Sequence, residues 1–240
     1  MKNKKPLKVL VTAGGTRVKI DAIRSIVNGS SGRFGTEIVK AFDRALRVSA
    51  EYSNVGLYFL GTKLCTDSVH VPFLHESFVY QFDLFDEYSE KLDKLLSEIQ
   101  PDIVVLAAAV SDFAPMEETE GKISSDGDLT ITFKPLPKLI ATVRNKVPDS
   151  VICGFKCLDH ASDVELIEAA ISQIEKCGVD LVVANNWNTM KDVDHKIIIV
   201  KDTPIIDGYR GDVSIWSREF HDLASKVVEV CFEKYKQKNK

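Results

Sequence analysis

This sequence of 240 residues lacks the long hydrophobic segments of a membrane protein. The longest apolar run, Ile103 to Val110, is far shorter than the roughly 20 residues that cross a bilayer. The N-terminal stretch "MKNKKPLKVLVTAGG" passes directly into a predicted strand, without the apolar core of a signal peptide. We therefore expect a cytoplasmic protein without a membrane partner.

Histidine and regularly spaced cysteine are also scarce. The five histidines are scattered and show no His-Glu-x-x-His spacing, so we expect no metal site built by protein side chains. The five cysteines are an odd number without metal-type pairing, which predicts free thiols in a reducing compartment.

An excess of positive charge is missing as well, since the formal net charge is −4. Seven of the 31 lysines and arginines are lysines at the two ends, and without them the net charge of −4 becomes −11. This distribution disfavours a nucleic-acid surface, because such a surface needs a basic face to neutralise phosphates. The terminal lysines are Lys2, Lys4, Lys5, Lys234, Lys236, Lys238 and Lys240.

The apolar runs that are present predict the fold class. Continuous apolarity indicates parallel strands that are buried on both faces. Such runs occur near residues 7–13, 102–110, 150–155 and 179–185. Amphipathic helices are predicted between them and near the end of the chain, over about 217–234. We expect one α/β domain over residues 1–240, a doubly wound, Rossmann-like, mostly parallel sheet with helices on both faces. Residues 128–135 and 195–209 are predicted as antiparallel ribbons.

One predicted helix carries both of its end signals. Ser162 and Glu165 have the spacing of a capping box, and Gly178 is typical of a helix C-terminus.

Two small-residue loops follow the first strand. The Gly14-Gly15 turn permits close backbone approach, either for a phosphate or for packing alone. The second loop, "NGSSGRFG", offers amides and hydroxyls at a helix start, although an N-cap by Ser31 explains part of it without function. Asn28 before it could donate to a developing oxyanion.

Other candidates follow later strands. In "LAAAVSDFAP", three alanines leave room for a ligand along the backbone, and Asp112 either holds a nucleotide or metal or caps a helix. In "GFKCLD", a ring and an ammonium group, Phe155 and Lys156, suit a base and a phosphate. Loop lysines in "EGKISS" and "FKPLPKLI", and Lys176 near a helix C-terminus, suit phosphate binding. Solvation of the loop lysines and the helix dipole at Lys176 are the simpler explanations.

A dinucleotide-dependent oxidoreductase is the first alternative. No G-x-G-x-x-G opens a helix, "VGLYFLGTKLC" carries no acidic residue for a ribose, and no Tyr-x-x-x-Lys pair occurs. Many phosphate-directed groups without a covalent nucleophile favour electrostatic catalysis of nucleotidyl transfer instead.

The sequence resembles the phosphopantothenate–cysteine ligases, also called phosphopantothenoylcysteine synthetases, in the stand-alone form without a decarboxylase domain. The resemblance runs in order through "VLVTAGGTRVKIDAIRSIVNGSSGRFG", "AAAVSDFAP", "GKISS", "LTITFKPLPKLI", "GFKCLD" and "VDLVVANN". It implies a reaction of coenzyme A biosynthesis in which 4′-phosphopantothenate is joined to L-cysteine through an acyl-nucleotide. It also implies a homodimer, with an antiparallel ribbon such as 195–209 as a contact.

The resemblance implies a role for each matching residue. Asn28 and Lys122 are the catalytic residues, and Lys122 stabilises charge at the transferring phosphate. Substrate binding falls to Asn28, Ser30, Ser31, Gly32 and Ala109. Nucleotide binding falls to Ala107, Ala108, Asp112, Lys122, Pro137, Lys138, Leu139, Ile140, Phe155, Lys156 and Lys176. Mg²⁺ is implied with the nucleotide as a neutraliser, without a protein-caged metal.

Three departures concern the nucleotide. The chain has "KISS" where many relatives have "KIKK", "PLPK" where they have "KNPD", and "ANN" where they have "AND". CTP is favoured over ATP, and both remain open. A non-catalytic nucleotide-binding regulator on the same fold is the other alternative.

Overall fold

A computed structural model describes residues 7–49, 51–52, 55–69, 78–117, 119–189, 195–202 and 212–239. Eight strands form the main sheet, in the order β12-β11-β10-β9-β6-β1-β4-β5. Six of them are parallel: β1 (Leu7–Ala13), β4 (Val55–Gly61), β5 (Val79–Gln81), β6 (Ile103–Leu106), β9 (Val151–Leu158) and β10 (Leu181–Asn186). Two antiparallel strands, β11 (His195–Lys201) and β12 (Asp212–Arg218), extend one edge. In chain order the parallel strands lie 3-2-1-4-5-6, which is the doubly wound arrangement.

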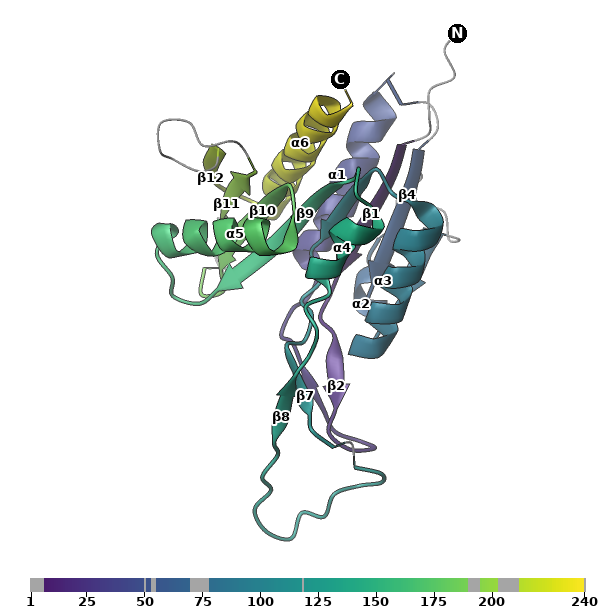
Figure 1. Ribbon diagram of the computed structural model, residues 1–240, viewed down its shortest axis with the longest axis vertical. Helices are drawn as coiled ribbons and strands as arrows, with labels where there is room; N and C mark the ends of the chain where they lie inside the picture. The colour runs from purple at the N-terminus through teal and green to yellow at the C-terminus, as the bar shows by residue number, and fades with distance from the viewer. Residues whose placement is uncertain are drawn as a thin grey trace.

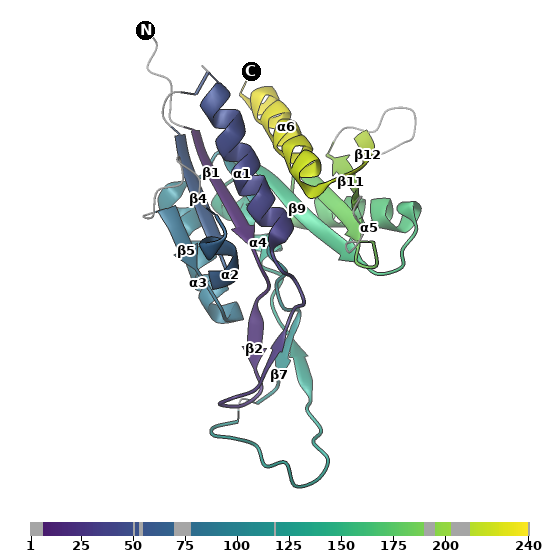
Figure 2. The ribbon, with the colours of Figure 1, turned by 180° about the vertical axis from the view of Figure 1, so that it is seen from behind.

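Helices cover both faces of this sheet (Figures 1 and 2). On one face, α1 (Arg33–Val48) and α6 (Phe220–Lys238) bury residues such as Phe42 and Val227 against Val9 and Val105. On the other face lie α3 (Phe85–Ile99), α4 (Ile140–Lys146) and α5 (Asp163–Cys177). A short helix, α2 (Lys63–Asp67), follows β4. The predicted fold class is therefore confirmed.

The predicted strands are found with changed bounds, and two parallel strands, β4 and β5, were not among them. The run 102–110 forms regular strand only to Leu106, because the Ala108 N–H then bonds the Thr12 hydroxyl (3.2 Å) and the Ala109 N–H bonds the Gly14 carbonyl (2.8 Å). These bonds carry the chain out of the sheet and toward the loops after β1.

The predicted ribbons are partly right. Within 128–135 only β8 (Phe133–Pro135) is strand, and its partner is β7 (Phe113–Pro115). Within 195–209, β11 pairs on both sides, while residues 203–209 lie outside the described residues. The last helix begins at Phe220, after the predicted start, because Ser217 belongs to β12.

The helix-end signals of α5 are confirmed. The Ser162 side chain accepts from the Glu165 N–H (3.3 Å), the Glu165 carboxylate accepts from the Ser162 N–H (2.7 Å), and Gly178 is left-handed.

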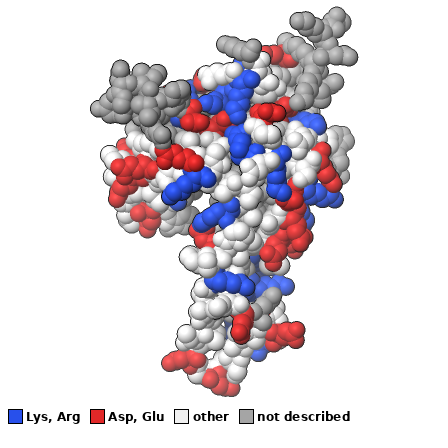
Figure 3. Space-filling model, in the orientation of Figure 1, with Lys and Arg blue, Asp and Glu red and all other residues white. Residues whose placement is uncertain are grey.

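A narrow arm projects from the carboxyl ends of the parallel strands (Figure 1). It consists of the hairpin β2 (Arg17–Lys19) and β3 (Ser25–Val27) and of β7 and β8 with the loop between them, and β2 packs against β7. Apolar side chains are exposed along it, and acidic side chains gather at its far end (Figure 3). The apolar ones include Ile23, Val27, Phe113, Met116 and Leu129.

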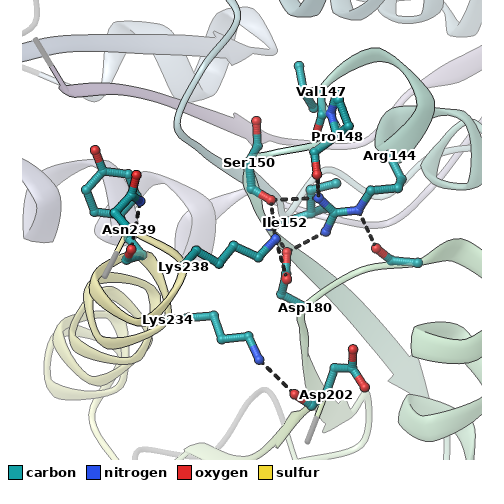
Figure 4. A network of polar contacts seen from close by, with 12 residues as sticks. Arg144, Val147, Pro148, Ser150, Ile152, Asp180, Asp202, Lys234, Lys238 and Asn239 are labelled. Atoms are coloured by element: carbon teal, nitrogen blue, oxygen red, sulfur yellow. Dashed lines mark hydrogen bonds and ion pairs between the residues drawn. The ribbon is translucent and has the colours of Figure 1, made fainter. Parts of the chain in front are cut away.

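A buried carboxylate, Asp180, ties four elements together at the amino end of β10 (Figure 4). It pairs with Arg144 of α4 (2.5 Å) and Lys238 of α6 (2.7 Å), and it accepts from the Ile152 N–H of β9 (2.8 Å). Charge-assisted bonds of this kind are stronger than neutral ones. The Asp180 cluster therefore fastens the C-terminal helix to the sheet.

Among the described residues, no helix is long and apolar enough to cross a membrane.

Candidate functional site

A cavity of about 820 Å³ opens at the carboxyl ends of the parallel strands. Its walls come from the carboxyl-terminal parts of β6, β9 and β10 and from the segments that follow β1 and β6. It therefore includes the crevice between β1 and β6 where the strand order reverses. Ligands of open α/β sheets bind at this place. Every predicted site residue except Lys122 lines the cavity.

The loop that ends in Ser30, Ser31 and Gly32 forms one wall. The Ser30 hydroxyl accepts from the Gly32 N–H (3.2 Å), and the Ser31 hydroxyl accepts from the Arg33 N–H (3.4 Å). Gly32, not Ser31, is the N-cap residue, with φ of 68°, so the predicted N-cap was one residue too early. The first turn of α1 leaves N–H groups without intrahelical partners beside the cavity, and such groups attract anions.

The other glycine turn does not line the cavity. A Cβ on Gly14, whose φ is 97°, would lie 2.6 Å from the Thr62 side chain, and a Cβ on Gly15 would lie 2.5 Å from the Asn28 carbonyl oxygen. The structure therefore supports packing, and not phosphate binding, as the reason for glycines in this turn. The turn brings Asn28 and the second loop against β1.

The Asn28 side chain is held in one orientation. Its Nδ2 donates to the Ala109 carbonyl oxygen (3.1 Å), which also accepts from the Thr16 N–H (3.0 Å). Because a carbonyl oxygen only accepts, the amide nitrogen must face it. This bond fixes one N–H of the amide, and among the described residues the other N–H has no bonded partner.

The segment from Ala107 to Asp112 forms the adjacent wall. It is anchored by a buried pair of hydroxyls, since Thr16 Oγ1 lies 2.9 Å from Ser111 Oγ and accepts from the Ser111 N–H (2.8 Å). Asp112 forms an ion pair with Lys138. Its carboxylate therefore joins this wall to the loop 137–140.

Three lysines meet on the far wall around one thiol. Burial raises the pKa of Cys177, while the ammonium groups of Lys138, Lys156 and Lys176 act in the opposite direction. These lysines come from the loop before α4, from β9 and from α5, and all three line the cavity. They form a basic wall that suits a polyphosphate.

Aromatic rings complete the cavity. Phe155 packs edge-on against Phe34, with ring centroids 5.6 Å apart, and Phe34 also contacts Phe220. Trp187 and Gln173 line the cavity too, and sequence reasoning missed both. Trp187 directly follows the "VDLVVANN" run, which was a usable signal, whereas nothing in the helical pattern of α5 singles out Gln173.

Lys122 is not brought to this cavity. It is exposed in the loop between β7 and β8, beside the turn between β2 and β3, where the Ala22 N–H bonds the Gly121 carbonyl (2.9 Å). No group of three or more metal-ligating side chains occurs among the described residues.

Comparisons with known proteins place the chain in a family. The model for the DNA/pantothenate metabolism flavoprotein C-terminal domain matches residues 4–51 and 83–209. The coenzyme A biosynthesis bifunctional protein CoaBC of Thermococcus kodakarensis is 36% identical over 193 residues, covering 80% of this chain and 44% of that protein. CoaBC of Methanocaldococcus jannaschii is 30% identical over 183 residues, covering 75% and 40%. The chain spans less than half the length of these relatives.

Solved structures agree on the fold. The DNA/pantothenate metabolism flavoprotein from Streptococcus pneumoniae has a TM-score of 0.77 at 22% identity, covering 95% of this chain and 99% of its own. A Cab2 mutant in complex with phosphopantothenate-cysteine has a TM-score of 0.73 at 17% identity, covering 97% and 87%. The cavity at the strand-order reversal, the match to the family model and the identity to the Thermococcus protein lead to one conclusion: this chain belongs to the family of the DNA/pantothenate metabolism flavoprotein C-terminal domain.

Proposed function

We propose that this protein is a phosphopantothenate–cysteine ligase, acting in coenzyme A biosynthesis in the cytoplasm. One observation carries the proposal: a single cavity joins the Asn28–Gly32 loop and the start of α1 to the basic wall of Lys138, Lys156 and Lys176. The loop and the start of α1 suit the substrate phosphate, and the basic wall suits a triphosphate. All five cysteines are free, in keeping with a reducing compartment.

Two steps account for the chemistry. The carboxylate of 4′-phosphopantothenate attacks the α-phosphorus of the nucleotide, which forms an acyl-nucleotide and expels pyrophosphate. The amine of L-cysteine then attacks the acyl carbon, forms the amide, loses a proton and expels the nucleoside monophosphate. Both steps develop negative charge on oxygen, so fixed N–H donors and ammonium groups lower their barriers.

We assign Asn28 to the acyl-nucleotide. Since its first N–H is held by Ala109, the second can donate to the acyl oxygen without reorientation. The amides of the first turn of α1, with Ser30 and Ser31, bind the substrate phosphate. Ala109 and its neighbours lie along the pantothenate chain.

The nucleotide occupies the remaining walls. Phe155 and the loop 137–140 border the base, Ala107 and Ala108 contact the nucleotide backbone, and the three lysines bind the phosphates. We favour CTP over ATP. Mg²⁺ would be held mainly by phosphate oxygens and water, with Asp112 as the carboxylate among the lining residues, and would neutralise the triphosphate.

We also propose that Lys122 acts within a homodimer. Lys122 lies on the arm and not in the cavity of its own chain, and the arm exposes apolar side chains of the kind that mark interfaces. A second copy that receives this arm would obtain Lys122 in its cavity. The arm suits this contact better than β11, whose backbone is paired on both sides.

The test is pyrophosphate release by the purified protein with 4′-phosphopantothenate, Mg²⁺ and either CTP or ATP. Release that requires 4′-phosphopantothenate, followed by monophosphate when L-cysteine is added, is the expected result. The Asn28→Ala variant should fold normally and lose turnover. Nucleotide binding without release would favour the regulator, and NAD(P)H binding would favour a reductase.

Complementation tests the dimer. The Asn28→Ala and Lys122→Gln variants should each lose turnover by about 10²-fold or more when alone. A 1:1 mixture that exchanges subunits should recover about a quarter of the wild-type sites, because half of the dimers would be mixed and each would have one intact site. A mixture that forms mixed dimers and stays inactive would show that Lys122 serves its own chain.

A further inference from the structure

A buried carboxylate lies at the turn of the arm, far from the walls of the cavity. The Asp21 side chain has no exposed surface and accepts three backbone bonds. Two come from its own turn, the N–H groups of Ile23 (2.9 Å) and Arg24 (2.7 Å), and the third comes from Ile123 (3.1 Å), across 102 positions of sequence. The Arg24 guanidinium adds an ion pair of 2.7 Å.

The partners of this turn flank Lys122 on both sides. The Gly121 carbonyl accepts from the Ala22 N–H (2.9 Å), and the Ile123 carbonyl accepts from Arg24 Nη1 (3.0 Å). With the bond from the Ile123 N–H to Asp21, the residues before and after Lys122 are both fixed to the turn 20–24. Lys122 itself is exposed and makes none of these bonds.

We infer that Asp21 is the positioning residue of Lys122: it fixes the peptide around this lysine so that its ammonium group extends from a defined point on the arm. The inference rests on the proposed catalytic role of Lys122. It gives a function to a buried charge that no step of the reaction uses.

The need for such a residue follows from the loop. Between β7 and β8, the described residues 116–117 and 119–132 form no regular strand or helix. A lysine in an unfixed loop must be ordered in each turnover, and fixing one backbone residue costs about 1–2 kcal/mol of conformational entropy. The bonds between the Asp21 turn and the loop form when the protein folds, so the entropy cost of ordering the loop does not fall on the catalytic step.

The carboxylate also keeps its charge over the working pH range. Burial would raise the pKa of Asp21, but the backbone N–H groups of Ile23, Ile123 and Arg24 and the Arg24 guanidinium outweigh it and lower the pKa to about 2. An asparagine amide at this position would turn its NH₂ group toward N–H donors that the carboxylate now accepts from, and it could not bond to them. Asp21→Asn is therefore a nearly isosteric change that weakens the bonds to the loop.

The experiment compares wild type with Asp21→Asn and with a control, Asp126→Asn. Asp126 lies in the same loop, and its carboxylate accepts only from the nearby Ser124 hydroxyl among the bonds that the structure describes (2.7 Å). Trypsin cleavage of the Lys122–Ile123 bond, followed by mass spectrometry, reports on the loop independently of activity. We expect cleavage on the order of 10-fold faster in Asp21→Asn and unchanged in the control, since proteolysis tracks local opening.

Kinetics complete the test. Asp21→Asn should lower kcat on the order of 10-fold with the nucleotide KM unchanged, and should add less than about two-fold in a Lys122→Gln background, because the two residues act as a unit. Unchanged cleavage, or equal losses of kcat with and without Lys122, would overturn the inference.

A second variant covers failure of Asp21→Asn to fold. Ile123→Pro removes the N–H that Asp21 binds, and it should lower kcat and show the same non-additivity with Lys122→Gln. Failure of the proposed function has a different signature, since wild type itself would then release no pyrophosphate.

Discussion

Replacement of Gly32 by alanine tests whether the phosphate loop depends on close packing beneath it. Gly32 has φ of 68°, and a Cβ there would lie 2.2 Å from the Cys65 sulfur and 2.6 Å from the Gly14 nitrogen. A left-handed residue with a side chain costs about 1–2 kcal/mol. Overpacking adds about 1–3 kcal/mol, because the Gly14 backbone cannot rotate away. We expect Gly32→Ala to lower the free energy of unfolding by about 2–5 kcal/mol in total.

Gly127→Ala is the matched control. Gly127 also has a positive φ, of 102°, but a Cβ there would have no atom within 4 Å. It should therefore cost only the strain of about 1–2 kcal/mol. Urea unfolding measures both losses, and the KM for 4′-phosphopantothenate should rise in Gly32→Ala alone, since the start of α1 must shift. Equal losses of stability in the two variants would refute the packing argument.

The remaining predictions concern stability. The pKa of Asp21 is about 2 in the folded protein, below its ordinary value of 3.8, so its contribution to stability is complete above pH 3.8 and is lost as the pH falls through 2. When unfolding is measured at decreasing pH, Asp21→Asn should therefore lose less stability than wild type. Asp180→Asn should lower the free energy of unfolding by about 2–4 kcal/mol, because Arg144 and Lys238 lose the charge of their buried partner. The loss is moderated because these two cations are partly exposed to water. The exposed control Asp93→Asn should lower it by about 0–1 kcal/mol. Ser162→Ala should cost about 1 kcal/mol in urea unfolding through the lost capping box, with no change in KM, and a raised KM would contradict a purely structural role.

Much of the site could be predicted because strand ends converge. Lys156, Ala109 and Gly32 each follow or end a recognisable strand or open a helix, and parallel strands bring their carboxyl ends to one edge. Lys138 and Lys176 lie in a loop and at a helix end, and their place in the cavity was predicted from the family pattern.

Other features depend on contacts that no local pattern records. Gly14 and Gly32 have the same small-residue signature, but only the three-dimensional packing shows that one supports the cavity and the other lines it. Gln173 was missed because nothing in the helical pattern of α5 singles it out, and Trp187 was missed because it lies just beyond the run that predicts β10. Lys122 matches a motif, yet it lies outside the cavity because its loop is bonded to the turn of the β2–β3 hairpin, 102 positions away along the chain.

The Asp180 cluster has a consequence for how this family can change. It fastens α4 and α6 at the amino end of β10 (Figure 4). Asn185 and Trp187 line the cavity at the carboxyl end of the same strand. Stability is thus anchored at one end of the strand and ligand contact at the other. Substitutions in the cavity can therefore accumulate while the opposite end of the strand continues to hold the fold, and ligand specificity can diverge without compensating changes in the core.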